Sequence, residues 1–465
     1  MQLEIQSTVP MMTDRPLRVL LFGKDGRTDA IAEGIRSSAM SCELSICAPF
    51  ASPGLAAKAD HFASASLTDL EAMVRLTRQS RADLVVVGPE DPLAAGLSDA
   101  VAALGVACFG PTQELARVET SKSWTRSLLD RHGIDGNPRH QAFRHARGLW
   151  EYLNELGAVV VKPDGLTGGK GVKVQGEQLA SHEEALAYGL ALLEADGSVV
   201  IEERLDGEEF SLQTITDGEA FVHCPIAQDH KRAFEGDTGP NTGGMGSYSC
   251  PDGSLPFLSD ADVSAARLIN EAVVHGLGRE VGQPYRGVLY GGFMATAGGV
   301  ALIEYNARFG DPEAMNVLPL MSGGLLELLW ATAQGRLGAV DVAFSPRATV
   351  CKYVVPDAYP DEGGAGAPIA TDESLLGPDL RCYWASAELA DDLTVRMTGS
   401  RAVAFVGIGS TTAEAERLAE RGASSVVGAV RHRRDIGTSG ALARRVDHLA
   451  RLRGAPSPTA APRHA

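Results

Sequence analysis

Residues 159–173, VVVKPDGLTGGKGVK, combine a predicted strand with a loop that is rich in glycine and lysine. The β-branched run predicts a short buried strand that ends at Lys162. The loop after it contains Gly168, Gly169, Lys170 and Gly171. Glycine lets backbone N–H groups approach an anion closely, and lysine supplies point charges for phosphate. The pattern predicts a flap over a polyphosphate, although a plain β-hairpin with solvated lysines also fits it.

A lysine near the start of a predicted helix is a second candidate for anion binding. The helix spans Ser121–His132, with Ser121 as its N-cap and Lys122 in its first turn. A cation there opposes the helix dipole, so either an anion meets Lys122 or the lysine is simply exposed. The GxxxxGK[ST] spacing is absent, which argues against a P-loop NTPase.

A carboxylate and an amide follow a predicted strand at residues 299–304. Glu304 and Asn306 share one face by the two-residue alternation of a strand. Their oxygens suit Mg²⁺, which takes a few protein oxygens together with phosphates and water. Arg308, on the same face if the strand persists, is placed to neutralise a transferring phosphoryl group. A solvated cluster of ion pairs is the alternative.

Two further polar segments are candidates for ligand binding. After a predicted strand at residues 199–203, Glu202, Leu205 and Glu209 are spaced to offer carboxylates and backbone groups to one ligand. Residues 237–246, DTGPNTGGMG, are too polar and glycine-rich for a core element. A surface Ω-loop is the alternative for the second segment.

The elements that must position these residues begin with an α/β unit. Predicted strands at 18–22, 44–47, 84–87 and 107–109 alternate with helical segments, one of them at 67–78. Such a doubly wound parallel sheet binds ligands at the carboxyl ends of its strands, here in loops such as residues 23–27. The full GxGxxG fingerprint is missing there, so NAD is a poor guess.

The remaining boundaries follow from changes in composition and pattern. Beyond residue 346, predicted strands at 349–354 and 402–408 and a helix at 411–423, with Thr412 as N-cap, indicate a small α+β module that packs and covers the site. In chain order, the sequence predicts a flexible leader at 1–16, an α/β domain at 17–115, a central domain at 116–345 with a lid at about 137–208, a C-terminal domain at 346–440 and a disordered tail at 441–465.

Composition narrows the class of protein. The chain has 465 residues, 44% of them apolar, and a formal net charge of −17. This charge argues against nucleic acid or an anionic membrane as a partner. Seven cysteines without metal-ligand spacing indicate reduced thiols in the cytoplasm. No apolar run is long enough to span a bilayer. We expect the chain to be a monomer or a small homo-oligomer.

Several long motifs carry a family resemblance. They are VVVGPEDPL, SKSWTRSLL, VVVKPDGLTGGKGV, VIEERLDGEE, QDHKR, DTGPNTGGMGSYS, IEYNARFGDPE and RRDIG. On these motifs the chain resembles the phosphoribosylamine–glycine ligases, also called glycinamide ribonucleotide synthetases, from about residue 18 to 437. The resemblance implies an ATP-grasp fold for the central domain. It also implies a cytoplasmic enzyme of purine synthesis that uses ATP and Mg²⁺ or Mn²⁺.

The same resemblance implies a reaction and a set of residue roles. ATP converts the carboxylate of glycine into an acyl phosphate, which 5-phosphoribosylamine attacks to form an amide. No nucleophilic side chain is needed, only positioning and charge neutralisation. The implied nucleotide ligands are Lys122, Lys162, Gly168, Gly169, Lys170, Gly171, Glu202, Leu205 and Glu209. The implied metal ligands are Glu304 and Asn306, and the catalytic residues Arg308 and Lys231. The implied substrate-binding residues are Gly23, Gly26, Arg27, Asp237, Asn241, Gly243, Gly244, Met245 and Asp311.

The chain departs from the family in the loops of its N-terminal domain, which in the family receives the phosphoribosylamine. The first loop usually reads GxGGREHA, whereas residues 23–30 read GKDGRTDA. The next loop often reads PGN-x-G, and residues 49–54 keep only part of it. Asp25 and Asp29 add negative charge where a phosphate is expected, which lowers affinity unless Lys24 and Arg27 compensate.

Two alternatives to the purine-pathway ligase follow. The altered first loop fits a paralogous ligase that joins another amine to a small carboxylate, for instance in secondary metabolism. A non-catalytic ATP-binding regulator is a third class. Loss of the metal pair would favour the regulator, but Glu304 and Asn306 are both present.

Overall fold

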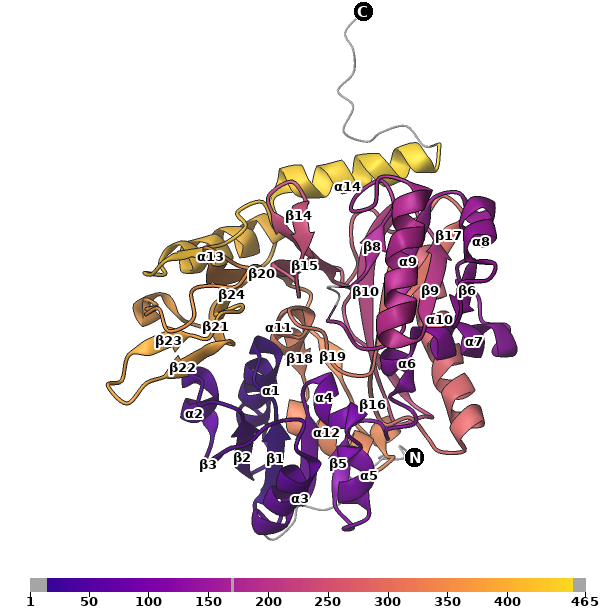
Figure 1. Ribbon diagram of the computed structural model, residues 1–465. Coiled ribbons are helices and arrows are strands. Elements are labelled where there is room, and N and C mark those ends of the chain that lie inside the picture. Colours follow the sequence, from indigo (N-terminus) through magenta and orange to yellow (C-terminus); the bar gives the residue numbers. More distant parts are fainter. Residues whose placement is uncertain (1–14, 169–170, 455–465) are drawn as a thin grey trace, which may run out of the picture.

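The computed structural model describes residues 15–168 and 171–454 (Figure 1). Four sheets, each with helices against it, surround a common centre. Among the described residues, none of the helices combines the length and apolar character that crossing a membrane requires. The predicted leader, 1–16, lies almost wholly outside the described residues.

The N-terminal sheet is parallel, with strand order β3-β2-β1-β4-β5. This order confirms the predicted doubly wound unit. Its core is apolar, and Leu21 and Phe22 of β1 are completely buried. The strands are β1 (Leu17–Phe22), β2 (Cys42–Ala48), β3 (His61–Ser64), β4 (Leu84–Val87) and β5 (Ala107–Phe109). The helices are α1 (Gly26–Arg36), α2 (Pro53–Lys58), α3 (Leu70–Gln79), α4 (Glu90–Ala94) and α5 (Leu97–Ala102).

Two sheets make up the central part of the chain. The smaller has strand order β6-β9-β7-β8, carries α8 and α9, and has its own apolar core. The larger has strand order β11-β10-β16-β17. The smaller sheet contains β6 (His140–Phe143), β7 (Val159–Pro163), β8 (Lys173–Val174), β9 (Val199–Glu203), α8 (Leu149–Leu156) and α9 (His182–Asp196). The larger contains β10 (Gly207–Thr216), β11 (Phe221–His223), β16 (Gly287–Thr296) and β17 (Gly299–Asn306).

Helices and short hairpins connect these sheets. Ser121 caps α7 by accepting a hydrogen bond from the N–H of Trp124, as the sequence predicts. The helices are α6 (Arg117–Thr120), α7 (Lys122–His132), α10 (Asp260–Val281), α11 (Glu313–Val317) and α12 (Leu325–Ala333). The hairpins are β13 (Arg232–Phe234) with β14 (Thr238–Asn241), and β22 (Ala387–Leu389) with β23 (Val395–Met397). Strands β18 (Met321–Ser322) and β19 (Ala343–Phe344), which flank α12, also pair with each other.

The fourth sheet joins distant parts of the chain. Its order is β12-β15-β20-β24-β21, and β25 also pairs with β20. Two of its strands, β12 and β15, come from the central part of the sequence. The elements are β12 (Gln228–Asp229), β15 (Gly246–Ser249), β20 (Ala348–Pro356), β21 (Leu380–Trp384), β24 (Val403–Gly409), β25 (Val430–Arg431) and α13 (Thr412–Ser424).

Two predictions for the C-terminal region are wrong. The cap of α13 is Thr411, whose hydroxyl accepts from the N–H of Glu414, so Thr412 is the first helical residue. The tail expected from residue 441 instead begins with α14 (Ser439–Leu452). Ordered structure there depends on distant contacts, since Leu449 is 2% exposed and Arg453 pairs with Asp262. The prediction for 455–465 lies outside the described residues.

A glycine in β24 generates the first testable prediction. A Cβ on Gly407 would lie 1.9 Å from the carbonyl oxygen of Ala415 and 2.7 Å from the N of Ala419, both backbone atoms of α13. Gly407→Ala must therefore push α13 off the sheet, and we expect the C-terminal part to lose about 1–3 kcal/mol of stability. Gly440→Ala in α14, which meets nothing within 4 Å, should leave stability unchanged or raise it slightly. Equal unfolding midpoints for the two variants in thermal denaturation would contradict this packing.

Candidate functional site

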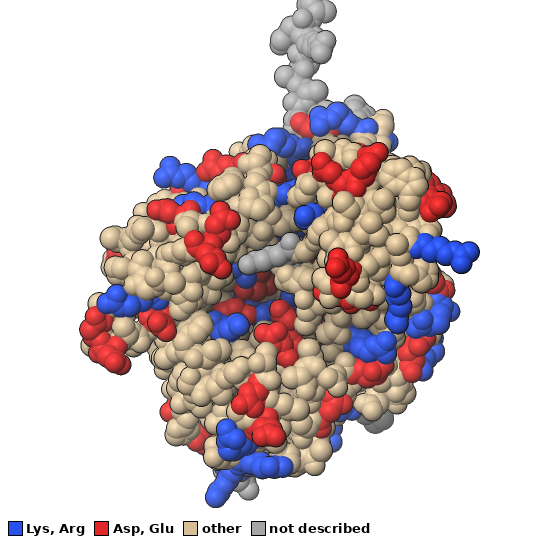
Figure 2. All heavy atoms as spheres, in the orientation of Figure 1, with Lys and Arg blue, Asp and Glu red and all other residues tan. Residues whose placement is uncertain are grey.

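A cleft of about 840 Å³ lies where the four sheets meet. Figure 2 shows a hollow in the centre of this face with charged side chains around it. Its lining comes from loop and helix residues of the N-terminal unit, from strands of the other three sheets, and from α14. The predicted residues that line it are Arg27, Lys122, Lys162, Gly168, Glu202, Leu205, Glu209, Lys231, Asp237, Asn241, Gly243, Glu304, Asn306, Arg308 and Asp311.

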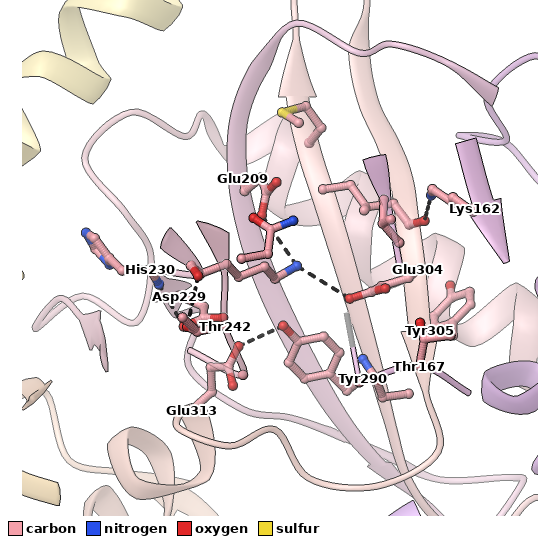
Figure 3. Close-up of a pocket in the computed structure, with 18 of the residues that line it drawn as sticks. Lys162, Thr167, Glu209, Asp229, His230, Thr242, Tyr290, Glu304, Tyr305 and Glu313 are labelled. Carbon is pink, nitrogen blue, oxygen red and sulfur yellow. Dashed lines mark hydrogen bonds and ion pairs between the residues drawn. The ribbon is translucent and has the colours of Figure 1, made fainter. Parts of the chain in front are cut away.

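Lys162 is fixed at the end of β7 by a buried carboxylate. Its Nζ lies 2.7 Å from Glu202 Oε2 and donates to the carbonyl of Ile303 at 3.0 Å (Figure 3). Arg126 binds both oxygens of Glu202, at 2.7 and 2.9 Å. Burial alone would raise the pKa of Glu202, but Arg126 and Lys162 lower it to about 2. The carboxylate of Glu202 therefore holds Lys162 in place, whereas the sequence suggested that it contacts the ligand itself.

A lysine between two carboxylates forms the centre of the cleft. Lys231 Nζ lies 3.4 Å from Glu304 Oε1 and 3.6 Å from Glu209 Oε2 (Figure 3). Burial would raise the pKa of Glu304, but Lys231 and Lys162 lower it to about 2. Burial would lower the pKa of Lys231, but the two glutamates raise it well above its ordinary value. Lys231 and Glu304 are therefore both charged at neutral pH.

Arg308 follows the last residue of β17 by two positions and is held by two glutamates. Its Nε lies 3.0 Å from Glu90 Oε2 and its Nη2 lies 3.1 Å from Glu119 Oε1. The Nη2 group also donates to Asn306 Oδ1 at 3.1 Å. Burial raises the pKa of Glu119 to about 7, although Arg308 opposes the shift. Arg308 reaches the cleft even though the strand ends at Asn306.

The first loop contributes charge to the cleft, but its glycines do not line it. Arg27 donates to the carbonyl of Phe309 at 2.7 Å and pairs with Asp25, which also caps α1. A Cβ on Gly23 would lie 2.1 Å from the Thr28 hydroxyl oxygen, and one on Gly26 would lie 2.5 Å from a tyrosine hydroxyl. Close packing therefore accounts for both glycines, which the sequence placed among the substrate ligands.

Asp29 does not face the cleft either. Its carboxylate is completely buried, lies 2.6 Å from Lys58 Nζ and accepts from the N–H of Trp384 at 2.8 Å. The side chain therefore ties α1 to α2 and to the C-terminal sheet. The predicted repulsion of a substrate phosphate is wrong for Asp29. Asp25 does line the cleft, together with Lys24 and Arg27.

The loop at residues 237–246 is held by an arginine that the sequence did not single out. Arg401 donates to the carbonyls of Gly243 and Gly244, at 2.6 and 3.0 Å. It also lies 2.7 Å from Asp311 Oδ2. Gly244 and Met245 do not line the cleft, because Met245 is wholly buried and Gly244 packs closely against its neighbours.

The predicted flap is the connection between β7 and β8, which pair antiparallel. Lys122 donates to the carbonyl of Gly165 at 2.9 Å, so the lysine of α7 reaches this connection. Gly171 packs against Pro163 and does not line the cleft. Gly169 and Lys170 lie outside the described residues.

Several cleft residues escaped the sequence prediction. Tyr290 donates to Glu313 Oε1 at 2.7 Å, and burial together with Glu313 raises the pKa of Asp229 well above its ordinary value. Asp229 and Glu313 lie inside motifs that were recognised, so their polarity was a usable signal. Arg401 and Arg445 come from the C-terminal region, where the sequence shows no catalytic pattern.

The oxygen-rich side of the cleft fits a divalent cation. Glu304 supplies an ionised carboxylate, and Asn306 an amide oxygen that already accepts from Arg308. Within residues 15–168 and 171–454, no group of three His, Cys, Asp or Glu is arranged to hold a metal by itself. Two protein oxygens completed by phosphate oxygens and water are the pattern expected for Mg²⁺ with a nucleotide.

Comparison with known families gives a match along nearly the whole chain. Three family models match in order: the phosphoribosylglycinamide synthetase N domain at residues 17–119, the ATP-grasp (A) domain at 120–314 and the C domain at 349–439. The phosphoribosylamine–glycine ligase of Methanococcoides burtonii is 44% identical over 437 residues, which cover 94% of this chain and all of that protein.

Solved structures give the same picture. The crystal structure of a phosphoribosylamine–glycine ligase from Thermotoga maritima matches with a TM-score of 0.75 and 27% identity, covering 90% of this chain and all of that one. A biotin carboxylase–β-γ-ATP complex from Campylobacter jejuni matches with a TM-score of 0.69 and 14% identity, covering 94% and 99%. The second match shows a shared fold alone.

The buried pair at Lys162 generates a prediction about stability and pH. Glu202→Gln leaves Lys162 and Arg126 buried without their anion, so it should cost about 3 kcal/mol in urea denaturation at pH 7. The pKa of Glu202 is about 2 in the folded chain, below its ordinary value of 4.5. Its stabilisation is therefore full above pH 4.5 and is lost as the pH falls towards 2. The variant should lose less stability than the wild type over that interval.

The neighbouring Glu203 provides the control. It pairs with the exposed Arg139 at 3.1 Å, so Glu203→Gln should cost less than about 1 kcal/mol at pH 7. Equal losses in the two variants would rule out a special role for the Glu202 carboxylate.

Proposed function

Because this chain belongs to the phosphoribosylamine–glycine ligase family, we propose that ATP-dependent ligation of glycine to 5-phosphoribosylamine takes place in the central cleft. The chain is accordingly an ADP-forming ATP-grasp carbon–nitrogen ligase of purine biosynthesis. One observation carries the assignment of the site. Lys162, Glu209 and Glu304 come from three different strands and line the same cleft.

The chemistry requires two transfers at one place. In the first, a carboxylate oxygen of glycine attacks the γ-phosphorus of ATP, and the bond to the β-phosphate oxygen breaks to release ADP. In the second, the amine nitrogen attacks the acyl phosphate carbon, phosphate leaves, and the nitrogen loses a proton. Both transfers concentrate negative charge, so fixed cations lower their barriers. Arg308 and Lys231, held in place by carboxylates, are the cations proposed for this role.

The nucleotide is proposed to lie between the smaller central sheet and β10. Lys122, Lys162 and the flap residues Gly168, Gly169 and Lys170 would bind its phosphates, and Glu209 its ribose. Backbone groups at Leu205 would meet the adenine. The support is that Lys122 and Lys162 approach this side of the cleft from separate elements and both lower the pKa of Glu304.

The metal ligands proposed are Glu304 and Asn306, and the metal is Mg²⁺ or Mn²⁺. When bound, it would neutralise phosphate oxygens and polarise the γ-phosphoryl group. Arg27, Asp311 and the loop with Asp237, Asn241 and Gly243 are proposed to bind the amine and the amino acid. A cytoplasmic location, and a monomer or small homo-oligomer, complete the proposal.

A direct assay tests the reaction. The protein is incubated with ATP, Mg²⁺, glycine and freshly generated phosphoribosylamine, and ADP and the amide are followed by coupled spectrophotometry and mass spectrometry. We expect one ADP for each glycinamide ribonucleotide. ADP release that depends on a different amine, with no such product, would overturn the assignment of the amine substrate.

Removing the proposed metal ligand tests the site itself. Glu304→Gln keeps the side chain's size but loses the anionic oxygen, so kcat should fall at least about a hundred-fold and the Mg²⁺ requirement should rise. Glu271→Gln in α10 is the control, because Glu271 pairs with His223 and does not line the cleft. Full activity in Glu304→Gln at low Mg²⁺ would reject this metal assignment.

A further inference from the structure

Helix α14 lies across two parts of the molecule. Figure 1 shows it running over β14 towards the strands of the central sheets. Thr438 caps its start by accepting from the N–H of Ala441. Just beyond its end, Arg453 makes two 2.8 Å contacts to Asp262 and donates to the carbonyl of Thr296. The helix thus links the C-terminal segment to the larger central sheet.

Arg445, in the middle of α14, joins two candidate ligand-binding segments. Its Nη1 lies 3.1 Å from Glu208 Oε2, and its Nη2 pairs with Asp237 Oδ2. Glu208 belongs to β10 and to residues 205–209, which we call the nucleotide hinge because Leu205 and Glu209 are proposed to bind adenine and ribose. Asp237 begins the proposed substrate loop, residues 237–246. One guanidinium therefore contacts both segments, and it lines the cleft itself.

The β10 end of this link is buried and faces two side chains of α14, Arg445 and His448. Glu208 is 2% exposed, and His448 Nδ1 lies 2.6 Å from its Oε1. Successive residues of a strand point to opposite faces, so Glu208 turns towards α14 while Glu209 turns towards Lys231. A shift of Glu208 would consequently move Glu209, the proposed ribose ligand, because the two share one backbone segment.

The loop end of the link has an unusual backbone conformation. Asp237 has φ of 56°, in the left-handed region that residues other than glycine rarely adopt. Its carboxylate also lies 3.0 Å from Arg433 Nη2, and Arg433 is 1% exposed. Two arginines from the C-terminal segment thus hold a residue that the loop alone would not favour in this conformation.

We propose that Arg445 is a positioning residue that couples nucleotide binding at the hinge to the ordering of the substrate loop. This inference rests on the proposed function, since it takes residues 205–209 as the nucleotide hinge and residues 237–246 as the substrate loop. When the nucleotide fixes Glu209, Glu208 holds Arg445, and Arg445 fixes Asp237. By linkage, a ligand of the loop must then tighten nucleotide binding by the same factor.

Arg453, just beyond the end of the same helix, provides a matched control. Arg445 and Arg453 each have a side chain that is 26% exposed, and each pairs α14 with a carboxylate of the central part of the chain. Arg453 is not among the residues that line the cleft. If the two arginines only attach α14 to the rest of the chain, losing either one should change the binding of the two ligands to the same extent. If Arg445 carries the coupling, only its loss should alter how the two ligands affect each other.

The experiment measures that mutual effect by calorimetry on the full chain. The dissociation constant of Mg²⁺–AMP-PNP is determined with and without saturating glycine, for the wild type, Arg445→Met and Arg453→Met. We expect glycine to tighten nucleotide binding about five-fold or more in the wild type and in Arg453→Met. In Arg445→Met the ratio of the nucleotide dissociation constant without glycine to that with glycine should fall towards one. Arg445→Lys should restore part of this ratio. The KM values for ATP and glycine should rise together in Arg445→Met.

Three outcomes overturn the coupling: a wild type without mutual tightening, an Arg445→Met variant that keeps it, or an Arg453→Met variant that loses it equally. Asp237→Asn serves as a second variant if Arg445→Met does not fold, because asparagine tolerates the left-handed backbone. It too should bring the ratio towards one. A wild type that binds neither ligand and forms no amide would instead refute the proposed function.

Discussion

Pairing of every buried cation with a carboxylate is the constraint on which the cleft depends. A lysine that is 4% exposed, such as Lys162, tends to lose its proton, because burial disfavours the charged form. Glu202 offsets that tendency at 2.7 Å, and Arg126 in turn holds Glu202. The same logic recurs at Lys231 with Glu209 and Glu304. The cleft therefore holds individual lysines and arginines at fixed positions where phosphates can meet them, each beside a carboxylate.

This constraint explains why the cleft needs all four sheets. The carboxylates that hold its cations come from elements far apart in sequence, such as Glu90 of the N-terminal unit for Arg308 and Asp311 for Arg401. Each such pair also joins two parts of the fold. Assembly of the molecule and formation of the charged site are consequently the same event, and the mutual arrangement of the sheets fixes the distances between charges.

Local signals in the sequence predicted several of the strands and helices and the residues of the motifs. The Ser121 cap and the strand at Val199–Glu203 were predicted as they are observed. Contacts between residues far apart in the sequence could not be predicted. Glu202 and Arg126 both lie inside family motifs, but nothing local showed that these residues, 76 positions apart, would pair. Asp29 looked like a charge near the substrate, yet Lys58 and Trp384 enclose it. Helix α14 was missed because its anchors lie in other parts of the chain.

The mixed origin of the fourth sheet has a consequence for biosynthesis on the ribosome. Strands β12 and β15 flank the substrate loop, yet β15 pairs with β20, which is synthesised about a hundred residues later. The partner that completes β20, strand β24, follows later still. When the nucleotide-binding strands have left the ribosome, the nascent chain therefore still lacks an ordered substrate loop. Vectorial synthesis thus delays assembly of a competent enzyme until β24 (Val403–Gly409) has been made.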